Sequence, residues 1–129
     1  MRSILQIADG RCYLCEMLKC DFSPKTVEEH HAIGGTSRRR LSEKYGLKFY
    51  LCPDHHRTGK HAVHKNAEVA AVLKDIAQRK FELEFPELDF MAIFSKNYKL
   101  DEKERRLCIK KLRGEESYEV DSRRNSESI

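Results

Sequence analysis

The chain has 129 residues, of which 40% are hydrophobic and 36% are charged, so it is long enough for one polar globular domain. No run of about 18 apolar residues is present, which argues against a membrane-spanning helix, and no targeting signal is visible. The five cysteines are odd in number, which favours metal binding in a reducing cytosolic or nuclear compartment over a disulfide framework.

Positive charge is concentrated in the middle of the chain. Residues 36–65 carry eight basic and two acidic side chains, whereas the residues beyond 100 carry eight of each. This local excess suits a polyanionic partner such as DNA. The alternative interpretation is a solvated basic surface.

The N-terminal half is predicted to contain a cysteine knuckle and two strands. Residues 12–24 form the knuckle, which a Ser-Pro turn closes. Strands are expected at residues 26–33 and 47–51. Between them we expect a loop that opens at two consecutive glycines, carries three consecutive arginines and turns into the second strand at Gly46.

The C-terminal half is predicted to be helical. From Asn66, a favourable N-cap residue, apolar side chains recur at helical spacing, and this helix should end before Pro86. A second short helix is expected to start at or near Pro86 and to present Phe90, Ile93 and Phe94 on one side.

The predicted organisation is one folded domain with a polar end. The domain with its helical extension covers residues 1–100, residues 101–112 form a peripheral and partly solvent-facing helix, and residues 113–129 form a disordered tail. The fold class is therefore α+β, a small core with additional C-terminal helices.

Two short pairs of zinc-type ligands are separated by 36 residues of sequence. Cys12 and Cys15 form one pair and Cys52 and His55 the other, and four thiolate or imidazole ligands are what a tetrahedral structural zinc ion requires. The sequence therefore predicts a zinc-stapled core. Ordinary buried thiols are the alternative, and Cys20 is a candidate substitute ligand.

A second cluster consists of histidines. All six histidines of the chain fall within 35 residues: His30, His31, His55, His56, His61 and His64. Alternation along a strand predicts that His30 and His31 point to opposite faces, so that one can bind a metal ion while the other acts on solvent. If His55 completes the zinc site, His56 is free for a second metal site, which His61 or His64 would complete.

These ordered motifs resemble the zinc-containing HNH endonucleases, also called ββα-metal or His-Me finger nucleases, and in particular the small versions carried by bacteriophages. The matching text covers roughly residues 10–99: CYLC, VEEHHAIGG, KYGLKFYLCPDHHRTGKHAVHKN and, more loosely, QRKFE and IFSKNY. The resemblance implies a ββα-metal, treble-clef-like nuclease domain in the cytoplasm, the bacterial host's if the protein is phage-encoded.

The family's roles carry over to matching positions. The resemblance makes His31 the general base that deprotonates the attacking water. It makes His30 and His56 ligands of a catalytic divalent ion, with His64 as the candidate that completes the shell. That ion would be magnesium or manganese, with zinc or nickel as alternatives, and would stabilise the leaving 3′ oxygen. Four arginines are candidates to bind the neighbouring DNA phosphates: Arg38, Arg39, Arg40 and Arg57.

One position departs from the family. The central asparagine, which orients the base histidine through the loop backbone, has no counterpart between Ile33 and Leu51, and Asn66 lies too far downstream. A loop carbonyl or another side chain must then orient His31, or catalysis is weak.

Three functions are consistent with these features. The leading prediction is a metal-dependent endonuclease, monomer or homodimer, that nicks or cuts DNA without an organic cofactor. The alternatives are a non-catalytic zinc-stabilised module for DNA binding or recombination, and a protein-interaction domain in which zinc only stabilises the fold.

Overall fold

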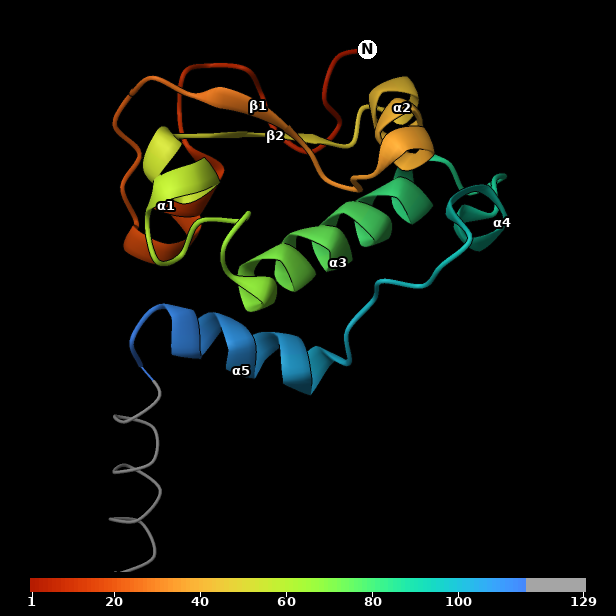
Figure 1. The fold of residues 1–129 in the computed structure, drawn as a ribbon. Coiled ribbons are helices and arrows are strands. Elements are labelled where there is room, and N and C mark those ends of the chain that lie inside the picture. Colours follow the sequence, from red (N-terminus) through yellow and green to blue (C-terminus); the bar gives the residue numbers. More distant parts are fainter. Residues whose placement is uncertain (116–129) are drawn as a thin grey trace, which may run out of the picture.

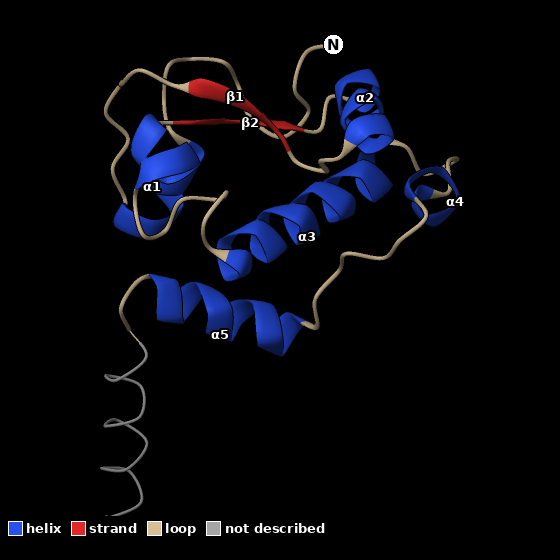
Figure 2. Ribbon diagram, in the orientation of Figure 1, coloured by secondary structure: helices blue, strands red, loops and turns tan. Residues whose placement is uncertain are grey.

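The computed structural model describes residues 1–115, and residues 116–129 lie outside the description. Helices and a two-stranded sheet make an α+β fold, which confirms the predicted class (Figure 1, Figure 2). The elements, of which η1 is a π-helix, are in chain order α1 (Tyr13–Lys19), β1 (Glu28–His31), α2 (Thr36–Tyr45), β2 (Lys48–Leu51), η1 (Asp54–Thr58), α3 (Ala67–Glu84), α4 (Phe90–Phe94) and α5 (Glu102–Leu112). No helix within residues 1–115 is long and apolar enough to cross a membrane.

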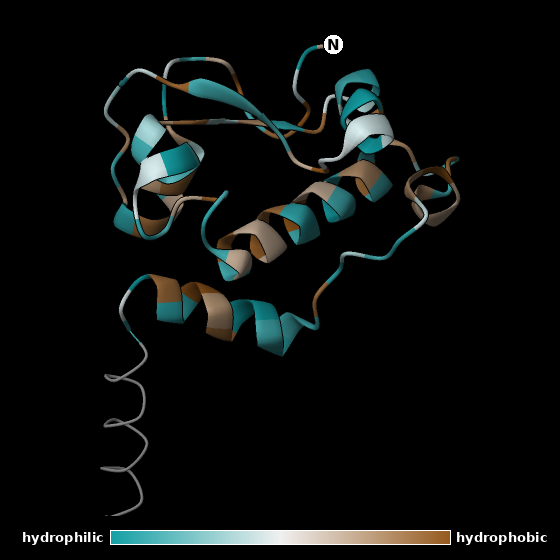
Figure 3. Cartoon of the chain, viewed as in Figure 1, coloured by the Kyte–Doolittle hydropathy of each residue, from teal (hydrophilic) through white to brown (hydrophobic). Residues whose placement is uncertain are grey.

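The two strands pair antiparallel but differ in character. Phe49 and Leu51 of β2 are fully buried, whereas β1 consists of two glutamates and two histidines that are exposed or half-buried, and Figure 3 shows β1 as hydrophilic along its length. The register pairs Glu28 with Leu51 and His31 with Lys48. Because β1 has no hydrophobic side chain to anchor it, backbone pairing with β2 fixes where its four polar side chains lie.

Helix α3 supplies one long side of the core. Its buried apolar face repeats every four residues, at Val69, Leu73, Ala77 and Phe81, which is the spacing of one helix face. The Asn66 side chain accepts hydrogen bonds from two backbone amides of the first turn, so the predicted N-cap is confirmed. The helix passes beneath the strands in Figure 1.

Helix α5 lies on the side of α3 away from the strands (Figure 1). It is tied there by the buried Asp75 of α3, which accepts hydrogen bonds from the Leu100 amide at 2.7 Å and from Arg105 Nη1 at 3.3 Å. The helix falls within the predicted range 101–112. Most of the tail predicted at residues 113–129 lies outside the described residues.

The segment between the strands is helix α2, so the prediction of a loop there was wrong. Gly35 precedes the helix and Gly46 ends it with a φ of 73°, the left-handed conformation that favours glycine at a helix C-terminus. The buried Ser42 hydroxyl donates to the Ile33 carbonyl at 2.9 Å and accepts from the Ile33 amide at 3.1 Å. The glycines that suggested a loop are therefore helix boundaries, and α2 is anchored to the end of β1.

Other elements also differ from the predictions. The knuckle at residues 12–24 contains helix α1, because the Cys12 thiol caps its first turn. The short helix expected near Pro86 is α4, which starts later because the Asp89 side chain caps it. Strand β1 is shorter than the predicted range 26–33.

Candidate metal centres

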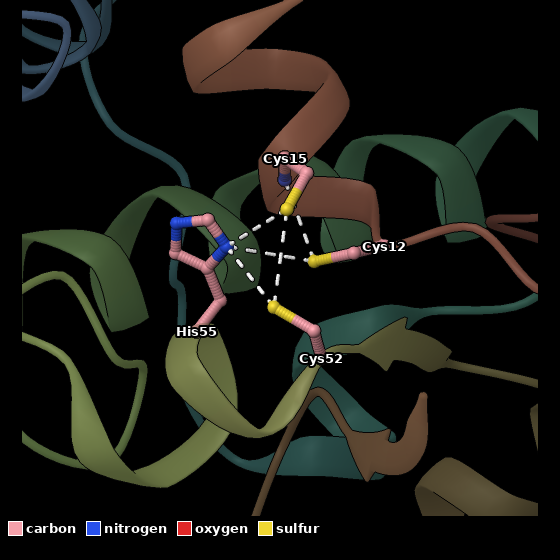
Figure 4. Close-up of side chains that lie close together, drawn as sticks. All are labelled: Cys12, Cys15, Cys52 and His55. Carbon is pink, nitrogen blue, oxygen red and sulfur yellow. Dashed lines mark hydrogen bonds between the residues drawn. The ribbon is translucent and has the colours of Figure 1, made fainter. Parts of the chain in front are cut away.

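Four ligand-type side chains converge where the start of α1 meets the turn after β2 (Figure 4). Cys12 and Cys15 belong to the first turn of α1 and its cap, Cys52 follows β2, and His55 lies in η1. The His55 Nδ1 atom lies 3.6 Å from Cys12 Sγ, 3.4 Å from Cys15 Sγ and 3.6 Å from Cys52 Sγ. The Sγ atoms of Cys15 and Cys52 are 3.8 Å apart. The structure thus brings together the four residues whose spacing predicted a zinc site.

The distances of this Cys3His cluster fit a tetrahedral zinc ion. Zinc bonds of about 2.3 Å to sulfur and about 2.0–2.1 Å to nitrogen place two sulfurs about 3.8 Å apart and a sulfur and a nitrogen about 3.6 Å apart. The observed spacings agree with both values. All four residues are buried, with exposed fractions from 0 to 8%. A closed, buried set of four ligands is typical of a structural metal such as zinc.

The ionisation of these groups also suits a metal. Burial and the neighbouring thiols raise the pKa of Cys15 to about 12, and burial raises the pKa of Cys12. A divalent cation reverses this preference, because a coordinating thiol loses its proton to the bond with the metal. Burial lowers the pKa of His55, which favours the neutral imidazole that metals bind.

Two cysteines and one histidine lie outside the metal-ligand groups found within residues 1–115. Cys20 is exposed at the end of α1, so the substitute ligand considered from the sequence is not part of the cluster. Cys108 is half-buried on α5. His61 lines a different hollow, next to His55.

The second group, the three-histidine cluster, consists of His30 on β1, His56 in η1 and His64 in the turn before α3. Their candidate ligand nitrogens all lie within 4.8 Å of one another, and the Nε2 atoms of His56 and His64 are 3.1 Å apart. Nitrogens bound to one ion at about 2.1 Å lie roughly 3.0–3.4 Å apart. The group can therefore supply one side of a metal's coordination shell.

Two rings of the cluster, those of His30 and His64, favour the neutral state. Burial and the charges that His56 and His64 would carry lower the pKa of His30 to about 3, and burial lowers the pKa of His64. Neutral imidazoles keep the lone pairs that a metal ion requires.

Glu28 supports this cluster and was missed from the sequence. Its Oε1 atom lies 2.6 Å from His56 Nδ1 and accepts a hydrogen bond from Arg57 Nε at 3.1 Å, and these two partners hold the pKa of Glu28 below its ordinary value. A carboxylate behind a histidine fixes the tautomer that presents Nε2 to a metal. Strand alternation places Glu28 on the same face as His30, so the period of two was an available signal.

His31 has its hydrogen-bond partners on α2. Its Nε2 atom lies 2.9 Å from Glu43 Oε1, and its Nδ1 atom accepts a hydrogen bond from Arg39 Nε at 3.4 Å. The side chain is 13% exposed. The structure thus gives the neighbouring His30 and His31 different partners.

An open cavity of about 520 Å³ joins His31 to the three-histidine cluster. Its wall includes the cationic side chains of Arg39, Arg57 and Lys74, with Glu29 as the acidic residue. Lys74 comes from α3 and was not a predicted site residue. A cavity lined by imidazoles and cationic side chains suits an anion such as a phosphodiester.

The four predicted phosphate-binding arginines have different surroundings. Arg39 and Arg57 line the cavity. The Nε atom of Arg38 donates to the Phe94 carbonyl at 3.1 Å and so connects α2 to α4. Arg40 is exposed on α2 and does not line the cavity.

Comparison of the chain with protein-family models, with curated proteins and with solved structures found no match.

Proposed function

We propose that the chain is a metal-dependent endonuclease of the HNH type that hydrolyses phosphodiester bonds of DNA. The observation that carries this proposal is the pair His30-His31. One histidine joins a three-histidine cluster, its neighbour faces a different set of partners, and both open to the same cationic cavity. A metal ligand beside an uncoordinated imidazole is what metal-assisted hydrolysis with a general base requires.

The proposed architecture is the ββα-metal core that the resemblance implies. Strand β1, the η1 segment and the turn before α3 would supply the catalytic side chains, β2 pairs with β1, and zinc at the Cys3His cluster would staple the treble-clef-like arrangement. His55 and His56 are adjacent in η1. Zinc bound at His55 would therefore also hold the backbone of His56 in place.

The catalytic ion would be held by His30, His56 and His64, and when bound it would neutralise charge on the scissile phosphate and on the leaving 3′ oxygen. Imidazole donors suit zinc, nickel and cobalt, whereas magnesium prefers oxygen ligands. The donor set therefore favours zinc or nickel over the magnesium or manganese expected first.

The remaining roles fall to the cavity wall. His31 would take the proton of the attacking water. Arg39, Arg57 and Lys74 would hold the phosphates on either side of the scissile bond, since a guanidinium matches phosphate oxygens in a bidentate fashion. The partner is then DNA, and cleavage of both strands would need a homodimer or two successive nicks.

A second candidate function is a non-catalytic zinc-stabilised DNA-binding module. The observation in its favour is that Arg39 Nε donates to His31 Nδ1, which covers the nitrogen that a base would use. Such a module would bind DNA with a steep salt dependence and would cut it with no metal ion.

A plasmid-nicking assay across magnesium, manganese, nickel, cobalt and zinc separates the two functions. We expect nicking by the wild-type protein with nickel, cobalt or zinc, and a loss of about 10²- to 10⁴-fold in His31→Ala, the usual contribution of a general base. His61→Ala is the matched control, because His61 lies outside both clusters. Absence of nicking by the folded wild-type protein with every ion would exclude the nuclease, and full activity of His31→Ala would exclude His31 as the base.

A further inference from the structure

Helix α2 places two side chains against His31, one at each ring nitrogen. Arg39 Nε lies 3.4 Å from Nδ1 and Glu43 Oε1 lies 2.9 Å from Nε2. The two residues are four positions apart, so they occupy the same face of the helix. The segment predicted to be a loop is therefore the element that holds the candidate base.

These contacts determine which nitrogen of His31 carries the proton. An arginine side chain has donors and no acceptor, so the Nδ1 atom that faces Arg39 must supply a lone pair. In the neutral ring the proton is then on Nε2, where Glu43 accepts it. Nδ1 is then the basic nitrogen, on the side of the ring that faces Arg39, a residue of the cavity wall, and it can take a proton from water only when the Arg39 contact opens.

Glu43 is itself held as a carboxylate in a fixed position. Its Oε2 atom accepts hydrogen bonds from the Met1 ammonium group at 2.7 Å and from Lys48 Nζ at 3.3 Å. The Met1 ammonium, then His31 and Lys48, hold the pKa of Glu43 far below its ordinary value. One oxygen is thus bound by cations, and the other is left for the imidazole.

A metal site at this position is less consistent with the contacts. Glu29, His31 and Glu43 form a third group of closely spaced ligand atoms. Lys48 Nζ lies 3.2 Å from Glu29 and 3.3 Å from Glu43, and the Met1 ammonium also lies against Glu43. Two cationic groups of the chain therefore already neutralise these carboxylates.

We propose that Glu43 is the positioning residue of the base: its carboxylate holds His31 in the Nε2-protonated tautomer and in a fixed orientation, the task that an asparagine loop performs in the HNH family. The inference rests on the proposed nuclease function for its catalytic consequence. A carboxylate that orients an imidazole and stabilises its protonated form is an established device in hydrolytic enzymes.

The kinetic test is a double-mutant cycle on single-turnover nicking. We expect Glu43→Ala to slow nicking by about 10²-fold, within the range of general-base effects, and the double variant His31→Ala/Glu43→Ala to be no slower than His31→Ala, because Glu43 acts through His31. Glu43→Gln, which keeps an acceptor oxygen, should restore part of the rate. DNA affinity and metal content should match those of the wild-type protein.

Glu84→Ala is the matched control, since Glu84 also pairs with a lysine, at 3.5 Å from Lys80, but lies on α3 outside the cavity. Nicking by this variant should stay near the wild-type rate. Wild-type nicking by Glu43→Ala, independent rate losses in the double variant, or loss of metal from Glu43→Ala would each overturn the proposal.

A spectroscopic measurement tests the same contact without activity. In ¹⁵N-labelled, zinc-loaded protein we expect a slowly exchanging Nε2-bound proton on His31 that disappears in Glu43→Ala and persists in Glu84→Ala. Its absence from the wild-type spectrum would overturn the positioning role. Its presence in a protein that cuts no DNA would instead show that the nuclease function is wrong while the contact is real.

Discussion

The Cys3His cluster and the three-histidine cluster meet in η1, where His55 faces one and His56 the other, yet they differ in exposure. The four residues of the first are all buried, whereas the second passes from the buried His56 to the exposed His64 and opens to a cavity. Closed four-ligand sites are structural, and catalytic sites keep an open position. The difference supports the proposal that the two adjacent histidines have different roles, because the fold covers one side of η1 and leaves the other open.

Removing a ligand from the closed cluster should have the largest effect. Cys52→Ala is expected to unfold the domain, because structural zinc contributes about 10–16 kcal/mol in small zinc domains, as much as the whole stability of many domains. Circular dichroism and zinc content are the measurements. Cys20→Ala, at an exposed position outside the cluster, should remain folded with zinc bound. A folded, zinc-free Cys52→Ala protein would show that the cluster is not a zinc site.

Removing support from the open cluster should leave the fold intact. Glu28→Gln is expected to weaken binding of the second metal ion by about 10- to 100-fold, the usual effect of losing a carboxylate behind a metal-binding histidine. Titration of nickel into protein that already holds one zinc ion measures this. Glu29→Gln, on the next residue of the strand, should bind as the wild-type protein does. Equal affinities for Glu28→Gln and wild type would separate Glu28 from the metal site.

The smallest effect is expected from substitutions in the cavity wall, which should change DNA binding. Arg57→Ala should reduce the slope of log K for DNA against log salt concentration by about 0.9, the contribution of one phosphate contact. Fluorescence anisotropy between low and moderate salt measures the slope. Arg40→Ala removes the same charge outside the cavity and should leave the slope closer to that of the wild type. Identical slopes for both variants would mean that DNA does not enter the cavity.

How much of the site could be predicted from the sequence depends on how far apart the contacting residues lie along the chain. The pairs Cys12-Cys15 and Cys52-His55 are local, and ligand spacing predicted them without knowledge of the fold. The cap at Asn66 was predicted for the same reason. Helix α2 could not be predicted in this way, because glycines lie at both of its ends and glycine is also typical of loops.

The supporting carboxylates show the limit most clearly. Glu28 reaches His56 across 28 residues and Glu43 reaches His31 across 12. Nothing local in the sequence distinguishes these two glutamates from solvated ones. Only the pairing of β1 with β2 and the packing of α2 against the end of β1 select them.

The sequence by itself determined the chemical inventory: an α+β chain with two zinc-type ligand pairs, a run of histidines and a basic middle segment. Ligand type and short spacing are written in the order of residues, so they can be read directly. The tertiary structure decided which histidine joins which cluster, which arginines line the cavity, and that a glutamate occupies the place beside His31. Those choices depend on side-chain direction and on contacts between distant segments, which exist only once the strands have paired and the helices have packed.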